Sequence, residues 1–212
     1  MRTERRDFDR EAAAWDENPA RVKLANEVAD AILQQIVLTA DMDVLDFGCG
    51  TGLLTLRLQP LARSVTGADS SQRMLDVLKA KAAKQHIANM RTQYLDFEKG
   101  DVPAGDYDLI ASSMTLHHVQ EIRPLFDQFH KLTRLGGYLC IADLDSENGR
   151  FHDDNTGVFH FGFDREALRK VFVEAGFGNV RDMTAAEVVK PTLTGEIRRF
   201  PVFLMTGRKD IS

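Results

Sequence analysis

The sequence is poor in residues that mark several specialised classes of protein. Its 212 residues include only two cysteines and one tryptophan. Two cysteines cannot build a disulfide-rich scaffold, and Cys49 and Cys140 both lie in apolar segments, so we expect reduced thiols in an intracellular protein. With 43% hydrophobic and 28% charged residues, the composition also argues against a disordered or collagen-like chain and predicts one globular domain with a substantial core.

An excess of positive charge and long apolar runs are also lacking. Lys and Arg number 27 against 32 Asp and Glu, a formal charge of −5, so the chain offers no general attraction to phosphate backbones. No segment approaches the run of about 18 apolar residues that a membrane helix needs. The charged amino terminus, MRTERRDFDR, lacks the apolar region of a signal peptide. We therefore expect a cytoplasmic protein that binds neither nucleic acid nor membrane.

Short apolar segments alternate with helical patterns through five cycles, which predicts an α/β fold with a doubly wound, mostly parallel sheet and helices on both faces. Two further β-rich segments have only PTLTG and its neighbours between them, so no crossover helix fits and we expect them to pair antiparallel at one edge. The predicted strands are 43–47, 64–68, 90–95, 106–112, 138–142, 184–190 and 199–207.

The same pattern divides the chain into regions. Residues 11–38 are predicted as helix with an interruption at Asn18-Pro19, and Gly136-Gly137 is expected to end the helix before the fifth strand. Ser70 or Ser71 and Asp164 are candidate helix caps. We expect an amino-terminal helical extension or lid over 1–40, a cofactor-binding core over 41–143, a substrate loop over 144–163 and a carboxyl-terminal helix with edge strands over 164–212.

The sharpest local pattern is VLDFGCGTG at 44–52, a predicted strand that runs into a glycine-rich turn. Glycines at this place bring a ligand against the main chain. A dinucleotide fingerprint needs a third glycine where Leu53 stands, and Asp46 would repel a pyrophosphate. An acid before the glycines instead suits a cationic amino group, as in an amino acid moiety.

Two more acids follow neighbouring predicted strands. Asp69 ends the second strand, where a carboxylate can accept both hydroxyl hydrogen bonds of a ribose. Asp96 follows the third strand, where it can accept from an adenine amino group while Phe97 packs on the ring. Together with the turn, these acids predict a nucleoside site.

With these motifs, the chain resembles the class I S-adenosylmethionine-dependent methyltransferases. VLDFGCGTG, GADSS, LDFE, DLIASSMTLHHV and LTRLGGYLCIADL are similar to successive motifs of that family, and SMTLHHV resembles its small-molecule branch with the quinone-biosynthesis methyltransferases. The resemblance implies strand order 3-2-1-4-5-7-6 with strand seven antiparallel, and S-adenosylmethionine as the cofactor. The implied cofactor-binding residues are Asp46, Gly48, Cys49, Gly50, Gly52, Asp69, Ser70, Met74, Asp96, Phe97 and Ser112.

Departures from the family's other branches bear on the substrate. Ser112-Ser113-Met114-Thr115 stands where adenine methyltransferases carry Asn or Asp followed by Pro-Pro and an aromatic residue, and paired glutamates typical of arginine methyltransferases are absent. We therefore expect a small-molecule acceptor. The long loop and the amino-terminal helices are expected to roof its pocket, with Trp15, Phe151, His160 and Phe161 as candidate substrate residues.

Histidines supply the candidates for catalysis. His117 and His118 follow the fourth strand, and either is a candidate base for an acceptor that must lose a proton; the alternative is a pair of histidines without chemistry at a helix start. His152, Asp153, Asp154 and His160 are spaced too irregularly to predict a metal site, so no metal is expected.

The resemblance predicts in-line methyl transfer, assisted by alignment of the reactants and exclusion of water. Two rival functions remain open: a non-catalytic S-adenosylmethionine-binding module, and a nicotinamide-dependent oxidoreductase. The sequence does not indicate the methyl acceptor or the oligomeric state.

Overall fold

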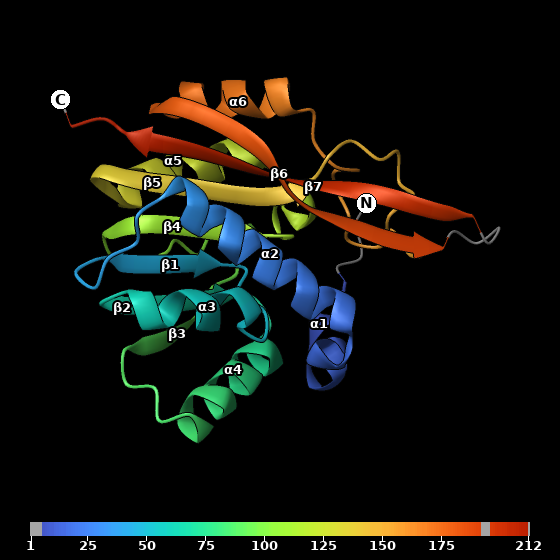
Figure 1. Cartoon of the computed structure of the whole chain (residues 1–212), viewed down its shortest axis with the longest axis horizontal. Coiled ribbons are helices and arrows are strands. Elements are labelled where there is room, and N and C mark those ends of the chain that lie inside the picture. The colour runs from blue at the N-terminus through green and yellow to red at the C-terminus, as the bar shows by residue number, and fades with distance from the viewer. Residues whose placement is uncertain (1–5, 192–195, 212) are drawn as a thin grey trace.

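The computed structural model describes residues 6–191 and 196–211, and its centre is one seven-stranded sheet in the order β3-β2-β1-β4-β5-β7-β6 (Figure 1). The order and the Rossmann-like architecture confirm the prediction from the sequence. The strands are β1 (Asp43–Phe47), β2 (Ser64–Asp69), β3 (Met90–Tyr94), β4 (Tyr107–Ser113), β5 (Thr133–Leu144), β6 (Phe177–Pro191) and β7 (Ile197–Lys209).

Helices cover both faces of this sheet. The α-helices are α1 (Phe8–Glu11), α2 (Pro19–Gln35), α3 (Leu53–Leu58), α4 (Gln72–Lys84), α5 (Ile122–Leu132) and α6 (Arg165–Glu174). Short 3-10 helices are η1 (Ala12–Glu17), η2 (Gln59–Leu61), η3 (Phe97–Lys99) and η4 (Leu116–His118). Helices α2 and α3 lie on one face, and α5 and α6 lie on the other (Figure 1).

Pairing between strands follows the connections. The strands β1 to β5 are parallel to one another, since a helix or loop returns the chain between them. β7 is antiparallel to both β5 and β6, as the short connection before it predicts. The carboxyl ends of β1, β2, β4 and β5 therefore meet at one edge, where ligands of open α/β sheets bind.

Central strands are buried on both faces, which is why β1 is a nearly continuous apolar run. Leu45 and Phe47 pack into a cluster with Phe126 and Phe129 of α5. Val44 faces the other way, toward the cluster formed by α2 and α3. Asp46 shares the face of Val44 because side chains alternate along a strand, and this places its carboxylate beside α3.

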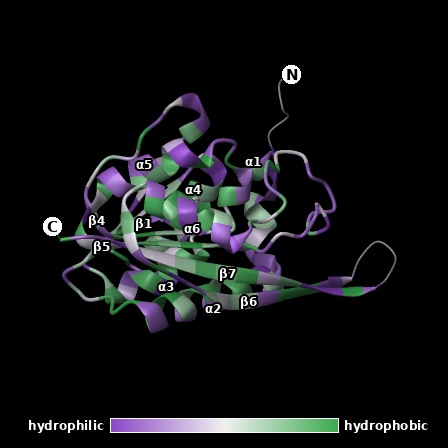
Figure 2. Cartoon of the chain, turned by 90° about the horizontal axis from the view of Figure 1, so that it is seen from above, coloured by the Kyte–Doolittle hydropathy of each residue, from purple (hydrophilic) through white to green (hydrophobic). Residues whose placement is uncertain are grey.

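Several boundaries differ from the expected ones. The helix predicted over 11–38 is divided into α1, η1 and α2, and α2 begins where Asn18 caps the backbone N–H of Ala20 at 2.9 Å. Ser71 and Asp164 cap α4 and α6 as expected. β6 and β7 are much longer than predicted and extend past the body of the protein (Figure 2).

The expectation that Gly136-Gly137 ends a helix is wrong. α5 ends at Leu132, and β5 already begins at Thr133, whose hydroxyl donates to the Phe129 carbonyl at 2.7 Å. The two glycines instead lie inside β5, where the register slips between the Tyr107–Thr133 and Leu109–Tyr138 pairs. A glycine pair therefore marks a bulge here, because the main chain must pass close to neighbouring backbone.

Within residues 6–191 and 196–211, no helix is long and apolar enough to cross a bilayer. Cys49 and Cys140 are free and buried, in agreement with the expected reduced thiols.

The bulge in β5 generates a stability prediction. A Cβ at Gly137 would lie 2.9 Å from the carbonyl oxygens of both Arg134 and Asp108, and backbone cannot move aside cheaply. We expect Gly137→Ala to lower the free energy of unfolding by about 1–3 kcal/mol, measured by urea unfolding. Gly178→Ala is the matched control, because there the new Cβ meets only the mobile Asp210 carboxylate at 3.1 Å. Equal destabilisation by the two substitutions would contradict this account of the bulge.

Candidate functional site

The glycine-rich turn after β1 is held against the end of β2. The backbone N–H groups of Gly48 and Cys49 both donate to the Ala68 carbonyl, at 2.8 and 3.0 Å. Gly50 adopts a φ of +53°, and a Cβ there would meet only the Met74 sulfur, at 4.0 Å. The main chain at Gly50 is therefore open on the side where a ligand would lie, which suits a close approach to the backbone.

Asp69, at the end of β2, holds this turn in place. Its carboxylate accepts from the backbone N–H of Gly50 and of Ser71, each at 2.8 Å. Burial raises the pKa of Asp69, while these N–H donors act to lower it. The expected ribose acid thus lies against the turn, with its charge largely removed from water.

Asp46 is more deeply buried than Asp69. Its side chain is 1% exposed and accepts from the Thr55 hydroxyl of α3 at 2.5 Å. Burial raises the pKa of Asp46 to about 7, against the lowering effect of the Thr55 hydroxyl. Such a carboxylate is stabilised by a cationic ligand group, the chemistry predicted from its position before the glycines.

The adenine-site candidates occupy the neighbouring segment. Asp96 is 2% exposed and forms an ion pair with Lys99 at 3.0 Å, and Phe97 packs against the core. Ser112, at the end of β4, is also buried, and its hydroxyl has no hydrogen-bond partner among the described residues. An orphaned buried hydroxyl beside the turn is an acceptor or donor that a ligand can use.

Three other predicted cofactor residues differ in their access to a ligand. Met74 lies beneath Gly50 and is fully buried, and Ser70 is exposed just before α4. Cys49 turns its side chain into a cluster with Leu75 and Leu78. Only the main chain of Cys49 borders the turn, so any contact of this residue with a ligand is made through its backbone.

The amino-terminal segment crosses directly over this site. Asp9 accepts from the Ser71 hydroxyl at 2.5 Å, and Asp16 accepts from the Thr51 hydroxyl at 2.6 Å. Trp15, a candidate substrate residue, packs edge-on to Phe8 and lies under the Arg21 guanidinium, 3.7 Å from the ring centre. The segment is thus tied to the turn by side-chain hydrogen bonds.

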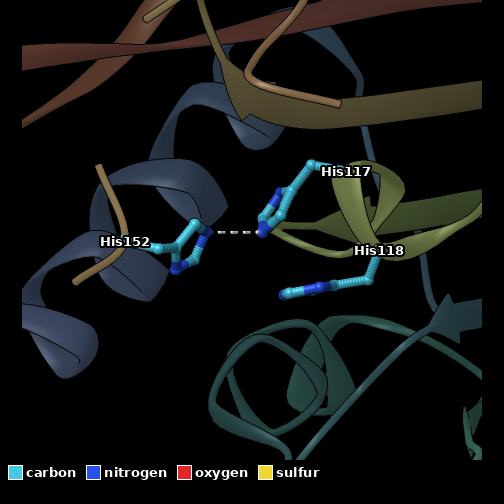
Figure 3. A group of neighbouring side chains, drawn as sticks. All are labelled: His117, His118 and His152. Carbon is cyan, nitrogen blue, oxygen red and sulfur yellow. Dashed lines mark hydrogen bonds between the residues drawn. The ribbon is translucent and has the colours of Figure 1, made fainter. Parts of the chain in front are cut away.

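A cluster of three histidines lies beside the same turn (Figure 3). His117 and His118 come from η4, which follows β4, and His152 comes from the long loop after β5. Thr115, just before η4, donates to the Gly48 carbonyl at 3.2 Å and so joins the glycine-rich turn to the histidines.

Hydrogen bonds orient each ring of the histidine cluster. His117 is 1% exposed, and its Nδ1 lies 2.7 Å from a carboxylate oxygen of Asp143, which is fully buried in β5. The His118 Nδ1 lies 2.7 Å from the Gly157 carbonyl oxygen. The Nε2 atoms of His117 and His152 are 3.2 Å apart (Figure 3). Burial lowers the pKa of His118 to about 4, so its ring is neutral at neutral pH.

The candidate substrate residues on the long loop after β5 lie in different surroundings. Phe151 packs edge-on to Phe200 of β7, 5.3 Å between ring centres, next to His152. His160 points elsewhere: its Nε2 lies 3.0 Å from the Val119 carbonyl oxygen, and Phe161 is 46% exposed. Phe151 therefore adjoins the histidine cluster through its ring, whereas His160 touches it only through its backbone N–H, which donates to the His117 carbonyl at 3.3 Å.

Two residues of this region, His152 in the cluster and Asp143 behind it, are not among the functional residues predicted from the sequence. His152 was considered only together with Asp153, Asp154 and His160, which the structure places apart from it on exposed or differently bonded positions. Asp143 was not considered, although an acid inside the apolar stretch CIADL is itself a signal of a buried, paired carboxylate.

Comparison with known protein families agrees with this geometry. Residues 44–137 match a family described as a methyltransferase domain. An uncharacterized methyltransferase of Schizosaccharomyces pombe is 32% identical over 161 residues, which are 69% of this chain and 57% of that protein. The ubiquinone biosynthesis O-methyltransferase of Coxiella burnetii is 34% identical over 128 residues, 60% of this chain and 51% of the relative. The chain thus spans little more than half the length of these two relatives.

Solved structures share the fold at low sequence identity. A protein solved with the Haloferax volcanii Trm112 methyltransferase activator has a TM-score of 0.77 at 17% identity, covering 97% of this chain and 99% of that one. The Haemonchus contortus phosphoethanolamine N-methyltransferase 2, in complex with S-adenosyl-L-methionine, has a TM-score of 0.68 at 14% identity, covering 86% and 52%. By the family match, the strand order and these structures, residues 44–137 form a methyltransferase domain, and the chain has the fold of the class I S-adenosylmethionine-dependent methyltransferases.

Proposed function

We propose that this protein transfers the methyl group of S-adenosylmethionine to a small-molecule acceptor held beside His117, His118 and His152. The observation that carries the proposal is the direct link between the two halves of the site. The Thr115 hydroxyl bonds the Gly48 carbonyl, so the cofactor turn and the histidine turn form one continuous surface at the carboxyl edge of the sheet.

The residues present fit the cofactor. The open main chain at Gly50 and the unpartnered Ser112 hydroxyl are features that a bound nucleoside and amino acid would complete. In this assignment Asp69 binds the ribose hydroxyls, Asp96 accepts from the adenine amino group, and Asp46 lies nearest to the cationic amino group. Each acid lies at or just after the end of a different strand, which separates the three groups of an extended ligand.

The cofactor supplies an electrophilic methyl group, so the chain need not form a covalent intermediate. Its own residues align the acceptor and exclude water. The amino-terminal segment is suited to the second task, because Asp9 and Asp16 bond it across the site. We assign residues 1–40 the role of a lid, 41–143 the cofactor core, 144–163 the acceptor loop and 164–212 structural support.

A small acceptor is supported by the walls of this site. The three histidine rings and Phe151 form its acceptor side, and an aromatic wall of this kind suits a small molecule. His118 is neutral at neutral pH and its Nδ1 faces the Gly157 carbonyl, which leaves Nε2 as a proton acceptor. A base role for His117 or His118 stays a prediction.

Cofactor binding provides the first test. Asp69→Ala removes an acceptor for two ribose hydroxyls, and we expect about 10–100-fold weaker binding of S-adenosylhomocysteine by calorimetry. Asp76→Asn is the control, since Asp76 lies exposed on α4 and pairs with its helix neighbours Gln72 and Lys79. Unchanged affinity in Asp69→Ala, or tighter binding of NADH than of S-adenosylhomocysteine by the wild type, would contradict the assignment.

The buried Asp46 predicts a pH dependence of cofactor binding. A cationic ligand group favours the charged carboxylate, and the free protein holds a proton there below the pKa of about 7. Affinity for S-adenosylhomocysteine therefore rises by up to about tenfold per pH unit up to neutral pH and then levels off. Calorimetry across this range measures the slope. Asp46→Asn is expected to flatten it, and an equal slope in the variant would exclude Asp46 as its cause.

Methyl transfer itself is tested with an isotopically labelled methyl donor and a metabolite extract. We expect at least one labelled small molecule with the wild type and none above background with Asp69→Ala. Labelled protein or nucleic acid in place of a small molecule would refute the proposed acceptor class. Cofactor binding without any labelled product across a broad panel would instead favour the non-catalytic binding module.

A further inference from the structure

The histidine cluster is assembled from segments far apart in the sequence, and nothing in the cofactor site requires it. His117 and His118 lie on η4 after β4, while His152 reaches them from the loop after β5 (Figure 3). One nitrogen of each ring lies within 4.8 Å of the others. Three imidazoles brought this close are costly to leave without a shared partner, because each presents a lone pair or an N–H to the same small space.

Two of the rings form a hydrogen bond through Nδ1 with a group outside the cluster, as metal-binding histidines typically do. The His117 Nδ1 donates to the buried Asp143 carboxylate at 2.7 Å, which leaves the Nε2 lone pair facing the cluster. The His118 Nδ1 donates to the Gly157 carbonyl at 2.7 Å, so the lone pair on its Nε2 is available to bind a metal ion. A carboxylate behind one ligand and a backbone carbonyl behind another are typical outer partners of a metal site.

The spacing agrees with metal coordination. Zinc–nitrogen bonds of about 2.0–2.1 Å at a tetrahedral angle place two ligating nitrogens about 3.3 Å apart. The Nε2 atoms of His117 and His152 are 3.2 Å apart, and the nitrogen of His118 lies within 4.8 Å of them. To reach the same distance, the nitrogen of the half-buried His118 has to move toward the other two, and the proposal includes this movement.

We propose that His117, His118 and His152 bind one divalent transition-metal ion, with zinc as the expected occupant, and that Asp143 orients His117 for this role. Three neutral nitrogen ligands match zinc better than magnesium or calcium, which prefer oxygen. Three protein ligands also leave a fourth position open, the arrangement of reactive rather than structural zinc sites.

The positive charge of Arg6 lies beside the proposed metal site and opposes the binding of a cation there. Its guanidinium lies 3.3 Å from the His152 Nδ1 and also bonds Glu11. While Arg6 donates to Nδ1, the His152 proton sits on Nε2 and points at His117. Metal binding moves this proton to Nδ1, ends the contact with Arg6 and leaves the guanidinium paired with Glu11. The Asp143 carboxylate remains as the negative charge nearest to the ion.

The open fourth position on the metal ion indicates the class of methyl acceptor, and this step rests on the proposed function. An acceptor thiol or hydroxyl in that position loses its proton to solvent more readily. Its lone pair then forms a bond to the methyl carbon as the carbon–sulfur bond of the donor breaks, and S-adenosylhomocysteine leaves. Zinc is a borderline-soft ion that binds thiolate sulfur well, so a small thiol is the expected acceptor and a phenol or other hydroxyl compound is the second arm of the test.

Metal binding is tested without reference to activity. The chelator-treated full-length protein is titrated with Zn²⁺ and with Co²⁺, followed by elemental analysis after gel filtration and by the visible spectrum of the Co²⁺ form. We expect one equivalent of metal per chain and a four-coordinate Co²⁺ spectrum that changes when a small thiol is added. His152→Ala is expected to weaken metal binding by at least about 100-fold, and Asp143→Asn by about 10–100-fold.

Matched controls separate the metal site from the fold and from the proposed function. His86→Asn changes an exposed histidine at the end of α4 and should keep full metal binding. S-adenosylhomocysteine affinity and circular dichroism report folding of each variant, and His152 lies on a loop outside the sheet. Failure of the wild type to retain stoichiometric Zn²⁺ or Co²⁺, or equal retention by His152→Ala, would overturn the metal site. Metal binding that survives while labelled methyl transfer fails would instead count against the proposed function alone.

Discussion

The close packing of Gly48 against Thr115 is the constraint on which the arrangement of the site depends. A Cβ at Gly48 would lie 2.2 Å from the Thr115 hydroxyl oxygen, and the glycine itself has a φ of +72°. No other residue allows the turn after β1 to approach the turn after β4 this closely. Because of that approach, the residues proposed to hold the cofactor and those proposed to face the acceptor share one edge of the sheet. In this proposal the contact between the Gly48 main chain and the Thr115 side chain sets the distance between donor and acceptor.

Buried carboxylates at this edge differ in what compensates their charge. Burial acts to raise the pKa of Asp143, but His117 and nearby N–H donors outweigh it, and the pKa is lowered. Burial also raises the pKa of Asp46 and Asp69, and there the internal hydrogen bonds do not outweigh it. The charge of Asp143 is already paired with His117 and stabilises the histidine cluster. The charges of Asp46 and Asp69 are not fully compensated within the protein, which suits them to a ligand's cation or hydroxyl groups. The contrast separates the acid that orients a histidine from the acids that we propose to bind the cofactor.

The order of elements could be predicted because it depends on local patterns. Buried strands such as β1 are apolar runs that end in glycine or acid, and the short connection before β7 leaves only an antiparallel pairing. Boundaries were less predictable where tertiary contacts override local signals. Gly136-Gly137 is a common helix-ending signal, yet here it forms a bulge within β5 because β4 lies alongside. The length of the β6–β7 hairpin likewise depends on pairing between the two strands, which composition does not reveal.

The sequence by itself determined the fold class, the cofactor and the acids after each strand, since these depend on motifs that are continuous along the chain. Tertiary structure alone decided which histidines act together. His117 and His118 are adjacent in the sequence, but their partners Asp143, His152 and Gly157 come from β5 and the loop beyond it. The ring of His160, an expected substrate residue, is instead bonded to the backbone carbonyl of Val119. The physical reason is that ring orientation is set by hydrogen bonds between distant segments, and these exist only once the sheet has brought its carboxyl ends together.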